Sequence, residues 1–149
     1  MLTRKGKYGL KALVHLSQVP EGQLAFVGDI ARENNIPKKF LDAILGELRN
    51  AGFVYSRKGK LGGYCLARPA EEIRIGHVVR VLDGPLAPFP CASKTRYQPC
   101  EDCDVETCQV RRVMLDVRNA IAEVLDNTSL VAMQAAGGPE AFASAQIRA

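Results

Sequence analysis

The chain has 149 residues, of which 47% are hydrophobic and 24% are charged, and its formal net charge at pH 7 is +4. These values are typical of one globular domain that builds its core without disulfides. No apolar run approaches the ~20 residues that cross a bilayer, and the N-terminus lacks the apolar stretch of a secretion signal. We therefore expect neither a membrane-spanning nor a secreted protein, but a cytoplasmic protein with no membrane partner.

The charge is distributed unevenly along the chain. Residues 1–68 hold twelve Lys and Arg against five Asp and Glu, a net charge of +7, whereas residues 69–149 hold eight against eleven, a net charge of −3. A basic half joined to a mildly acidic half suggests a module that binds a polyanion and carries a second function. Surface lysines that only keep the protein soluble would give the same sum.

The first half of the chain predicts three helices. Apolar residues recur at helical spacing over residues 7–18, over residues 25–34, and from Pro37 to about residue 51. A turn at residues 34–37 separates the second helix from the third. The face of the third helix that we expect to be buried consists of Phe40, Leu41, Ile44, Leu45 and Leu48.

After Gly52 the hydrophobic pattern changes from a helical to an alternating period. Short strands at residues 53–55 and 64–66 flank a basic, glycine-rich segment, which indicates a β-hairpin. Three helices followed by a hairpin are the order of a winged helix-turn-helix. We therefore predict a mostly α fold with a small β wing, in which residues 1–84, including a fourth helix that ends before Gly84, form the DNA-binding domain.

Two basic surfaces of this domain are candidates for contact with double-stranded DNA. The start of the third helix presents an outward face to the major groove. At the hairpin tip, glycines permit close approach of the backbone and basic side chains release counterions from the phosphates. The predicted DNA-binding set is Lys5, Lys7, Pro37, Lys38, Lys39, Asp42, Arg57, Lys58, Lys60, Gly62 and Gly63.

A cysteine-rich loop follows the winged domain over residues 85–107. Four of the five cysteines, Cys91, Cys100, Cys103 and Cys108, lie within 18 residues in the pattern C-x8-C-x2-C-x4-C. Thiolates so close in sequence can converge on one soft metal centre, either an iron–sulfur cluster or a tetrahedral Zn²⁺. The spacing does not choose between these two, and a thiol sensor without metal is a third possibility. Cys65, in the wing, is expected to pack as a small hydrophobic residue.

A long helix is predicted from Cys108 to about residue 126, and it carries an apolar seam. Because it follows a complete winged domain, we expect the seam to pack on a second copy and form a homodimer, with the recognition helices ~34 Å apart. Residues 108–135 would be a dimerisation helix and a short C-terminal helix, and residues 136–149 a weakly ordered tail. The predicted interface residues are Val110, Met114, Val117, Ile121 and Val124.

Three segments of the chain carry a family resemblance: residues 2–10, residues 36–52, and the wing at residues 62–69. The wing, G-G-Y-C-L-A-R-P, leads into I-x-I-G-x-V-V-R-V-L-D-G-P-L, which is a specific pattern. Over residues 1 to about 135 the chain resembles the superfamily of bacterial winged-helix transcription regulators that includes IscR, NsrR, RirA and CymR. The resemblance implies a homodimer that binds a palindromic promoter through the third helix and the wing.

The resemblance also bears on the cysteines, because many members bind a [2Fe–2S] or [4Fe–4S] cluster through three cysteines in this loop. Cys91, Cys100 and Cys108 match that trio best, with Cys103 as a fourth ligand or an alternative to Cys100. The spacing is wider than in IscR, and the histidine that follows the last cysteine of IscR is missing. Lys7 stands where the NsrR branch has an aspartate ligand. We therefore expect four protein thiolates as ligands.

These features predict a homodimeric transcription regulator, of the repressor type, whose promoter binding is controlled by an iron–sulfur cluster that senses iron, cluster status or redox state. The main alternative is a thiol- or zinc-based regulator without a cluster. A small iron–sulfur electron carrier is a further alternative, against which the basic wing argues. The sequence contains neither a nucleophile–base pair nor a phosphate-binding glycine loop, so we do not expect an enzyme.

Overall fold

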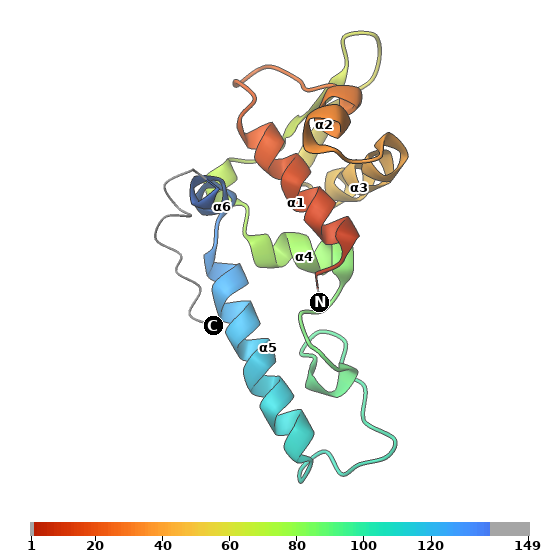
Figure 1. Ribbon diagram of the computed structural model, residues 1–149, viewed down its shortest axis with the longest axis vertical. Helices are drawn as coiled ribbons and strands as arrows, with labels where there is room; N and C mark the ends of the chain where they lie inside the picture. The colour runs from red at the N-terminus through yellow and green to blue at the C-terminus, as the bar shows by residue number, and fades with distance from the viewer. Residues whose placement is uncertain (1, 138–149) are drawn as a thin grey trace.

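The computed structural model describes residues 2–137 and has an elongated shape, with helix α5 extending away from a cluster of shorter helices (Figure 1). The helices and the single two-stranded sheet give the predicted mostly α fold with a small β wing. Residues 138–149, which make up most of the predicted tail, lie outside the described residues. The elements are α1 (Arg4–Ser17), α2 (Val27–Asn34), α3 (Lys38–Asn50), β1 (Val54–Arg57), β2 (Gly63–Leu66), the 3₁₀ helix η1 (Ala70–Glu72), α4 (Ile75–Asp83), the 3₁₀ helix η2 (Pro90–Ala92), α5 (Gln109–Asn127) and α6 (Leu130–Ala136).

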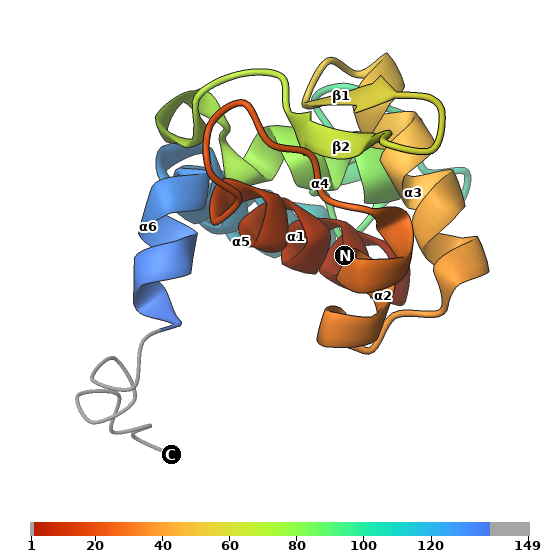
Figure 2. The same ribbon diagram turned by 90° about the horizontal axis from the view of Figure 1, so that it is seen from above.

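The hydrophobic core lies where α1 packs against α3, α4 and α6 (Figure 2). Each helix contributes one apolar stripe with spacings of three and four residues, and burial of these stripes is the main source of stability. The side chains that are almost fully buried include Leu13, Ile30, Leu41, Ile44, Leu45, Leu48, Ile73, Ile75, Val78 and Leu130. None of the helices within residues 2–137 has the length and apolar character that a transmembrane helix needs.

Helix α1 begins three residues earlier than the sequence predicted because Thr3 caps it. The Thr3 hydroxyl accepts from the backbone N–H of Gly6. The backbone N–H and the hydroxyl of Thr3 also donate to the carboxylate of Asp83, at 2.8 and 2.5 Å. A side chain at the end of α4 therefore fixes the start of α1, a contact between residues that lie 80 positions apart.

Helix α2 begins two residues later than predicted because Ala25 belongs to the wing. The backbone N–H of Ala25 donates to Tyr64 O at 2.9 Å, and Tyr64 N–H donates to Ala25 O at 2.8 Å. These bonds extend the antiparallel β1–β2 pair, in which Val54 lies opposite Leu66. The segment before α2 thus fastens the hairpin to the helical core.

The predicted burial of Phe40 is wrong: its side chain is 61% exposed, whereas Leu41, Ile44, Leu45 and Leu48 are buried. These four residues follow the i, i+3, i+4, i+7 spacing of one helix face. Phe40 precedes Leu41 by one residue and is therefore rotated by about 100° from that face. It lies instead on the outward surface of α3, beside Lys39.

Helix α5 packs against the core only through its C-terminal half. Ile121, which we predicted for a dimer interface, is half-buried against the core of its own chain, together with Ala122 and Leu125. The close approach to α4 depends on Gly76, because a Cβ there would lie 1.9 Å from Asp126 Oδ1. Arg80, one turn further along α4, donates to both oxygens of Asp126, at 2.6 and 2.9 Å.

The Arg80–Asp126 pair predicts a pH-dependent stability difference. Arg80 lowers the pKa of Asp126 below its ordinary value of 3.8. The pair therefore stabilises the folded chain fully at pH values above the ordinary pKa, and this stabilisation is lost as the pH falls through the lowered pKa of the folded chain. Asp126→Asn should reduce the free energy of unfolding at neutral pH by about 0.5–1 kcal/mol. In urea titrations the difference from wild type should shrink below the ordinary pKa. Asp116→Asn, an exposed change on the same helix, is the control, and a pH-independent difference for Asp126→Asn would contradict the assignment.

Candidate metal centre and nucleic-acid interface

The four clustered cysteines come together around one surface cavity of about 290 Å³. Cys91, Cys100 and Cys103 approach it from the loop, and Cys108 from the start of α5; all four are half-buried thiols. The rest of the lining is formed by Phe89, Asp102, Val110 and Arg111. The chain therefore places the predicted ligands around a common space, at the end of the molecule opposite the wing (Figure 1).

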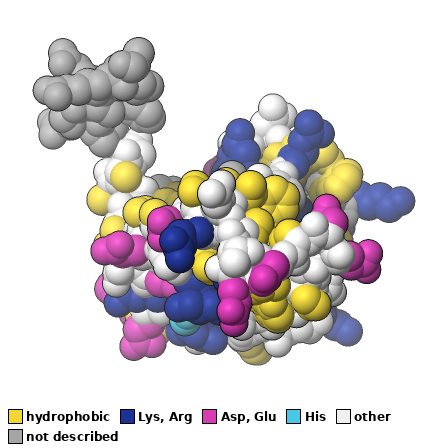
Figure 3. Space-filling view, turned by 90° about the horizontal axis from the view of Figure 1, so that it is seen from below, with side chains coloured by type: hydrophobic (Ala, Val, Ile, Leu, Met, Phe, Trp, Pro, Cys, Tyr) yellow, Lys and Arg dark blue, Asp and Glu magenta, His cyan; other side chains and the backbone are white. Residues whose placement is uncertain are grey.

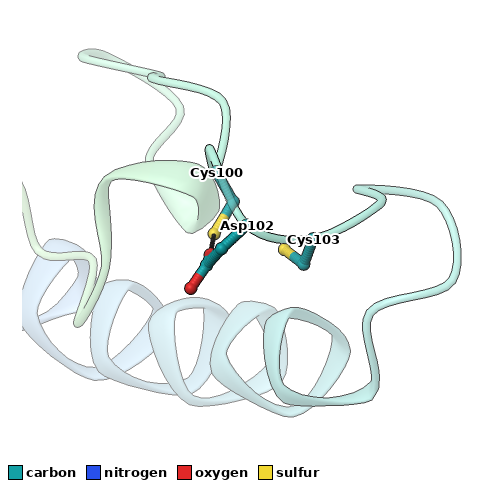
Figure 4. A group of neighbouring side chains, drawn as sticks. All are labelled: Cys100, Asp102 and Cys103. Carbon is teal, nitrogen blue, oxygen red and sulfur yellow. Dashed lines mark hydrogen bonds between the residues drawn. The ribbon is translucent and has the colours of Figure 1, made fainter.

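Asp102 is a member of this group that the sequence reasoning missed. One oxygen of Asp102 and the sulfurs of Cys100 and Cys103 all lie within 4.8 Å of one another. Cys100 Sγ donates to Asp102 Oδ1 at 2.8 Å, and the three side chains lie between the loop and the first turns of α5 (Figure 4). The signal in the sequence was the acidic pair between the two cysteines of C-E-D-C.

Cys108 caps the N-terminus of α5, as its position in the sequence suggested. The backbone N–H of Arg111 donates to Cys108 Sγ at 3.4 Å, and this bond lowers the pKa of the Cys108 thiol from its ordinary value of 9.0. The free N–H groups of a helix N-terminus favour negative charge. The Cys108 thiol is therefore prepared to ionise more readily than an ordinary cysteine.

Cys103 behaves in the opposite way. Its hydrogen bond with Cys100, followed by burial and the nearby Cys108, raises the pKa of the Cys103 thiol to about 12. Thiolates this close repel each other, so they cannot all ionise without a cation between them. Four sulfurs and a carboxylate around one cavity form a donor set that fits a soft metal centre, and they suit an iron–sulfur cluster or Zn²⁺ equally.

Arg111 positions the first of the four cysteines. Its Nε donates to the backbone carbonyl of Cys91 at 2.8 Å, across 20 residues of chain. This bond holds the beginning of the loop against α5. Cys65 lies apart from the group, on β2 opposite Tyr55, as expected of a packing residue.

The predicted DNA-binding residues of α3 are all on the protein surface. Pro37, Lys38, Lys39 and Asp42 are exposed at its first turns, and Lys38 Nζ lies 3.2 Å from Asp42 Oδ2. Lys39 has no carboxylate within salt-bridge distance among the residues that the structure describes. It is therefore free to meet a phosphate or a base.

The two lysines predicted on α1 differ in their surroundings. Lys5 Nζ lies 2.8 Å from Glu47 Oε1 of α3, so this lysine ties two helices together. Lys7 is exposed. The charge of Lys5 is partly balanced within the chain, which the sequence pattern did not reveal.

The wing presents Arg57, Lys58 and Lys60 as exposed side chains. Its two predicted glycines have a structural reason of their own: a Cβ on Gly62 would lie 2.1 Å from Arg57 O, and one on Gly63 would lie 2.5 Å from Ala25 O. Helix α3 and the hairpin tip lie along the same edge of the molecule (Figure 2). This is the arrangement that joint contact with a duplex requires.

The predicted dimer seam divides into exposed and half-buried residues. Val110, Val117 and Val124 are 59%, 38% and 63% exposed, and Val113 is 55% exposed beside them. Met114 is half-buried, like Ile121. The exposed valines form a row on the side of α5 that does not pack on α4.

Comparisons with known proteins show the family to which the chain is related. Residues 2–136 match the family Rrf2, described as iron-dependent transcriptional regulator. The chain is 41% identical over 145 residues to an rrf2-like HTH-type transcriptional regulator of Rhodobacter capsulatus, covering 95% of this chain and 97% of that protein.

Solved structures show the same fold. The structure of CymR, the global cysteine regulator of B. subtilis, matches with a TM-score of 0.76 and 30% identity, covering 93% of this chain and 98% of that one. The structure of IscR from T. potens matches with a TM-score of 0.71 and 29% identity, covering 93% and 88%. The winged-helix fold and the resemblance seen in the sequence are thereby confirmed.

The opposite pKa shifts of Cys108 and Cys103 predict different reactivities in the metal-free protein. Since the thiolate is the nucleophile, iodoacetamide should alkylate Cys108 more than about tenfold faster than Cys103 at mildly alkaline pH. Peptide mass spectrometry of a time course measures both rates. In denaturant the two rates should converge, and equal rates in the folded protein would contradict the arrangement of the thiols.

Proposed function

The chain belongs to the Rrf2 family of transcriptional regulators, and from this premise we propose that it is a homodimer whose binding to a palindromic promoter is controlled by an iron–sulfur cluster. The named relatives are transcriptional regulators, so the chain is a regulator of transcription and not an enzyme. In the proposed division, residues 1–84 bind DNA, residues 85–107 form the sensor loop and residues 108–135 form the dimer contact.

The observation that carries the cluster is the convergence of Cys91, Cys100, Cys103 and Cys108 on one cavity. Soft thiolate donors are the usual ligands of iron–sulfur clusters, and the description of the family names iron. When bound, the cluster would add a redox-active, iron-dependent charge to the loop. Arg111 would hold Cys91 in place, and the helix N-terminus would stabilise the Cys108 thiolate.

The dimer is supported by the exposed valine row of α5. Four valines spaced three, four and seven residues apart leave an apolar strip uncovered on a helix whose other side packs on α4. A second copy offers the same strip, so a two-fold contact between two α5 helices would bury both. Val110 belongs to this strip and also lines the cysteine cavity. The proposed cluster and the proposed interface are therefore adjacent.

This adjacency supports a route for control. The cysteine cavity lies far from the wing, so a cluster would not contact DNA itself. Gain or loss of the cluster would change the order of the loop and the start of α5, and with it the spacing of two wings across the dimer. A cluster does this only if it favours one dimer arrangement over the other.

DNA binding would use the edge that carries α3 and the wing. The +7 charge of residues 1–68 attracts the phosphates, and Lys39 of α3 and Lys58 of the wing are exposed along that edge. The exposed ring of Phe40 lies beside Lys39 on α3. It would add an apolar contact to a sugar or a thymine methyl group.

The cluster is tested on protein purified without oxygen. We expect iron and acid-labile sulfide in the wild-type protein, with a brown colour and visible absorbance. Cys91→Ser, Cys100→Ser and Cys108→Ser should each lose most of the iron and sulfide, whereas the control Cys65→Ser should keep both. Zn²⁺ without sulfide, or no metal in protein that folds normally, would contradict the cluster and favour the zinc- or thiol-based regulator.

Control of promoter binding is tested in the same preparation. Fluorescence anisotropy with a palindromic duplex selected from random-sequence DNA should give different Kd values before and after iron chelation. Equal Kd values in both states would remove the cluster from the control of DNA binding, even if it is present.

If α3 and the wing contact DNA, substitutions there should change the salt dependence of DNA binding. Lys39→Ala and Lys58→Ala should each weaken binding and reduce the slope of log K against log salt by about 1, because each removes about one phosphate contact. Arg112→Gln removes a positive charge from the exposed side of α5 and should leave the slope unchanged. A slope that falls equally in all three variants would assign the effect to net charge rather than to this edge.

A further inference from the structure

A second cavity lies between α4, α5 and the loop after α4, and it shares no lining residue with the cysteine cavity. Its volume is about 630 Å³, within the range of about 300–1,000 Å³ that is usual for small-molecule sites. Polar side chains from all three segments line it beside the apolar side chains of Leu86 and Ala122. Nothing in the proposed DNA or cluster chemistry uses this space.

Arg118 is the unusual residue of this cavity. Its side chain lines the space, yet the residue is only 8% exposed and is the sole buried charged residue in the described part of α5. Its Nε donates to Asn119 Oδ1 at 3.1 Å, and its Nη2 donates to the same oxygen. Within residues 2–137 no carboxylate lies within 4.0 Å of its guanidinium nitrogens. A buried cation that has only a neutral acceptor is costly unless an anion joins it.

One acid of the cavity lining, Asp126, is already paired with another arginine. Both oxygens of Asp126 accept hydrogen bonds from Arg80. The charge of Arg118 also lowers the pKa of Asp126, but as the weakest of the contributions. Arg80, Lys94 and Arg118 line the cavity against Asp126 and Glu123, so the lining is positive by one charge with His77 neutral. Lys and Arg side chains gathered beside a histidine are visible on the face in Figure 3.

We propose that this cavity is a binding site for a small organic anion, whose carboxylate or phosphate group is held by Arg118. The flat fork of a guanidinium matches two oxygens of such a group. Lys94 and His77 lie on the same lining to bind its remaining polar atoms, and Leu86 and Ala122 offer contact to a short carbon chain. The site is independent of the proposed cluster, although both sites rest on the same loop and on α5.

Asn119→Asp is the sharpest test, because it converts the acceptor that Arg118 already uses into a carboxylate. Asn119 is exposed, so the variant should fold. The built-in carboxylate should raise the Tm of the ligand-free protein and remove its response to added anions. Asn50→Asp, an exposed change at the end of α3, is the matched control. Arg118→Gln should also abolish the response, with Arg112→Gln on the same helix as its control.

The full-length chain is titrated, without DNA, with succinate, glycerol phosphate and inorganic phosphate, each against sodium chloride at equal ionic strength. Wild type and both control variants should show a saturable rise in Tm of about 2–4 °C with at least one probe, and calorimetry should give a Kd. A response to succinate alone assigns a carboxylate, and a response to the phosphates assigns a phosphate group.

Three results would overturn the proposal. The first is no difference between the probes and chloride in the wild type. The second is a full response in Asn119→Asp. The third is a response of Arg118→Gln as large as that of its control Arg112→Gln, which would mean that the anion binds elsewhere. None of these results bears on the iron and sulfide content, so this site and the cluster are tested separately.

Discussion

The joint between α4 and α5 is the constraint on which the other features of this protein depend. Asp126 sits where only a glycine at position 76 leaves room, and Arg80 holds both of its oxygens. This contact fixes the C-terminal half of α5 to the winged domain while its N-terminal half projects away. Helix α5 therefore connects the winged domain to the cysteine loop at the far end of the molecule.

Three features follow one another along α5. The thiol cavity lies at its beginning, the exposed valine row runs along one side, and the cavity of Arg118 lies where the helix meets α4. An event at any of them acts on the same helix, since a helix moves as a unit rather than bending at one residue. A regulator with this architecture can combine more than one chemical signal in the geometry of a single element.

The hairpin of the winged domain is held to the helices by short backbone contacts rather than by a large sheet. The hairpin is fastened to the core through Ala25, and the glycines at positions 62 and 63 permit the close approach of three chain segments. A two-stranded hairpin alone is only marginally stable in water. The segment of Ala25, which pairs with the hairpin, therefore fixes the direction in which the basic tip points relative to α3.

The sequence by itself determined the order of helices and hairpin, the stripe of Leu41, Ile44, Leu45 and Leu48, and the gathering of four cysteines before a helix N-terminus. These features are local, because periodicity, capping and turn chemistry act over a few residues. Only the tertiary structure decided that Phe40 points outward, that Ala25 pairs with the wing and that Asp102 joins the thiols. It also decided that Arg118 is buried with no carboxylate beside it among residues 2–137. Each of these depends on which distant segments meet, and a pattern within one segment carries no record of its neighbours in space.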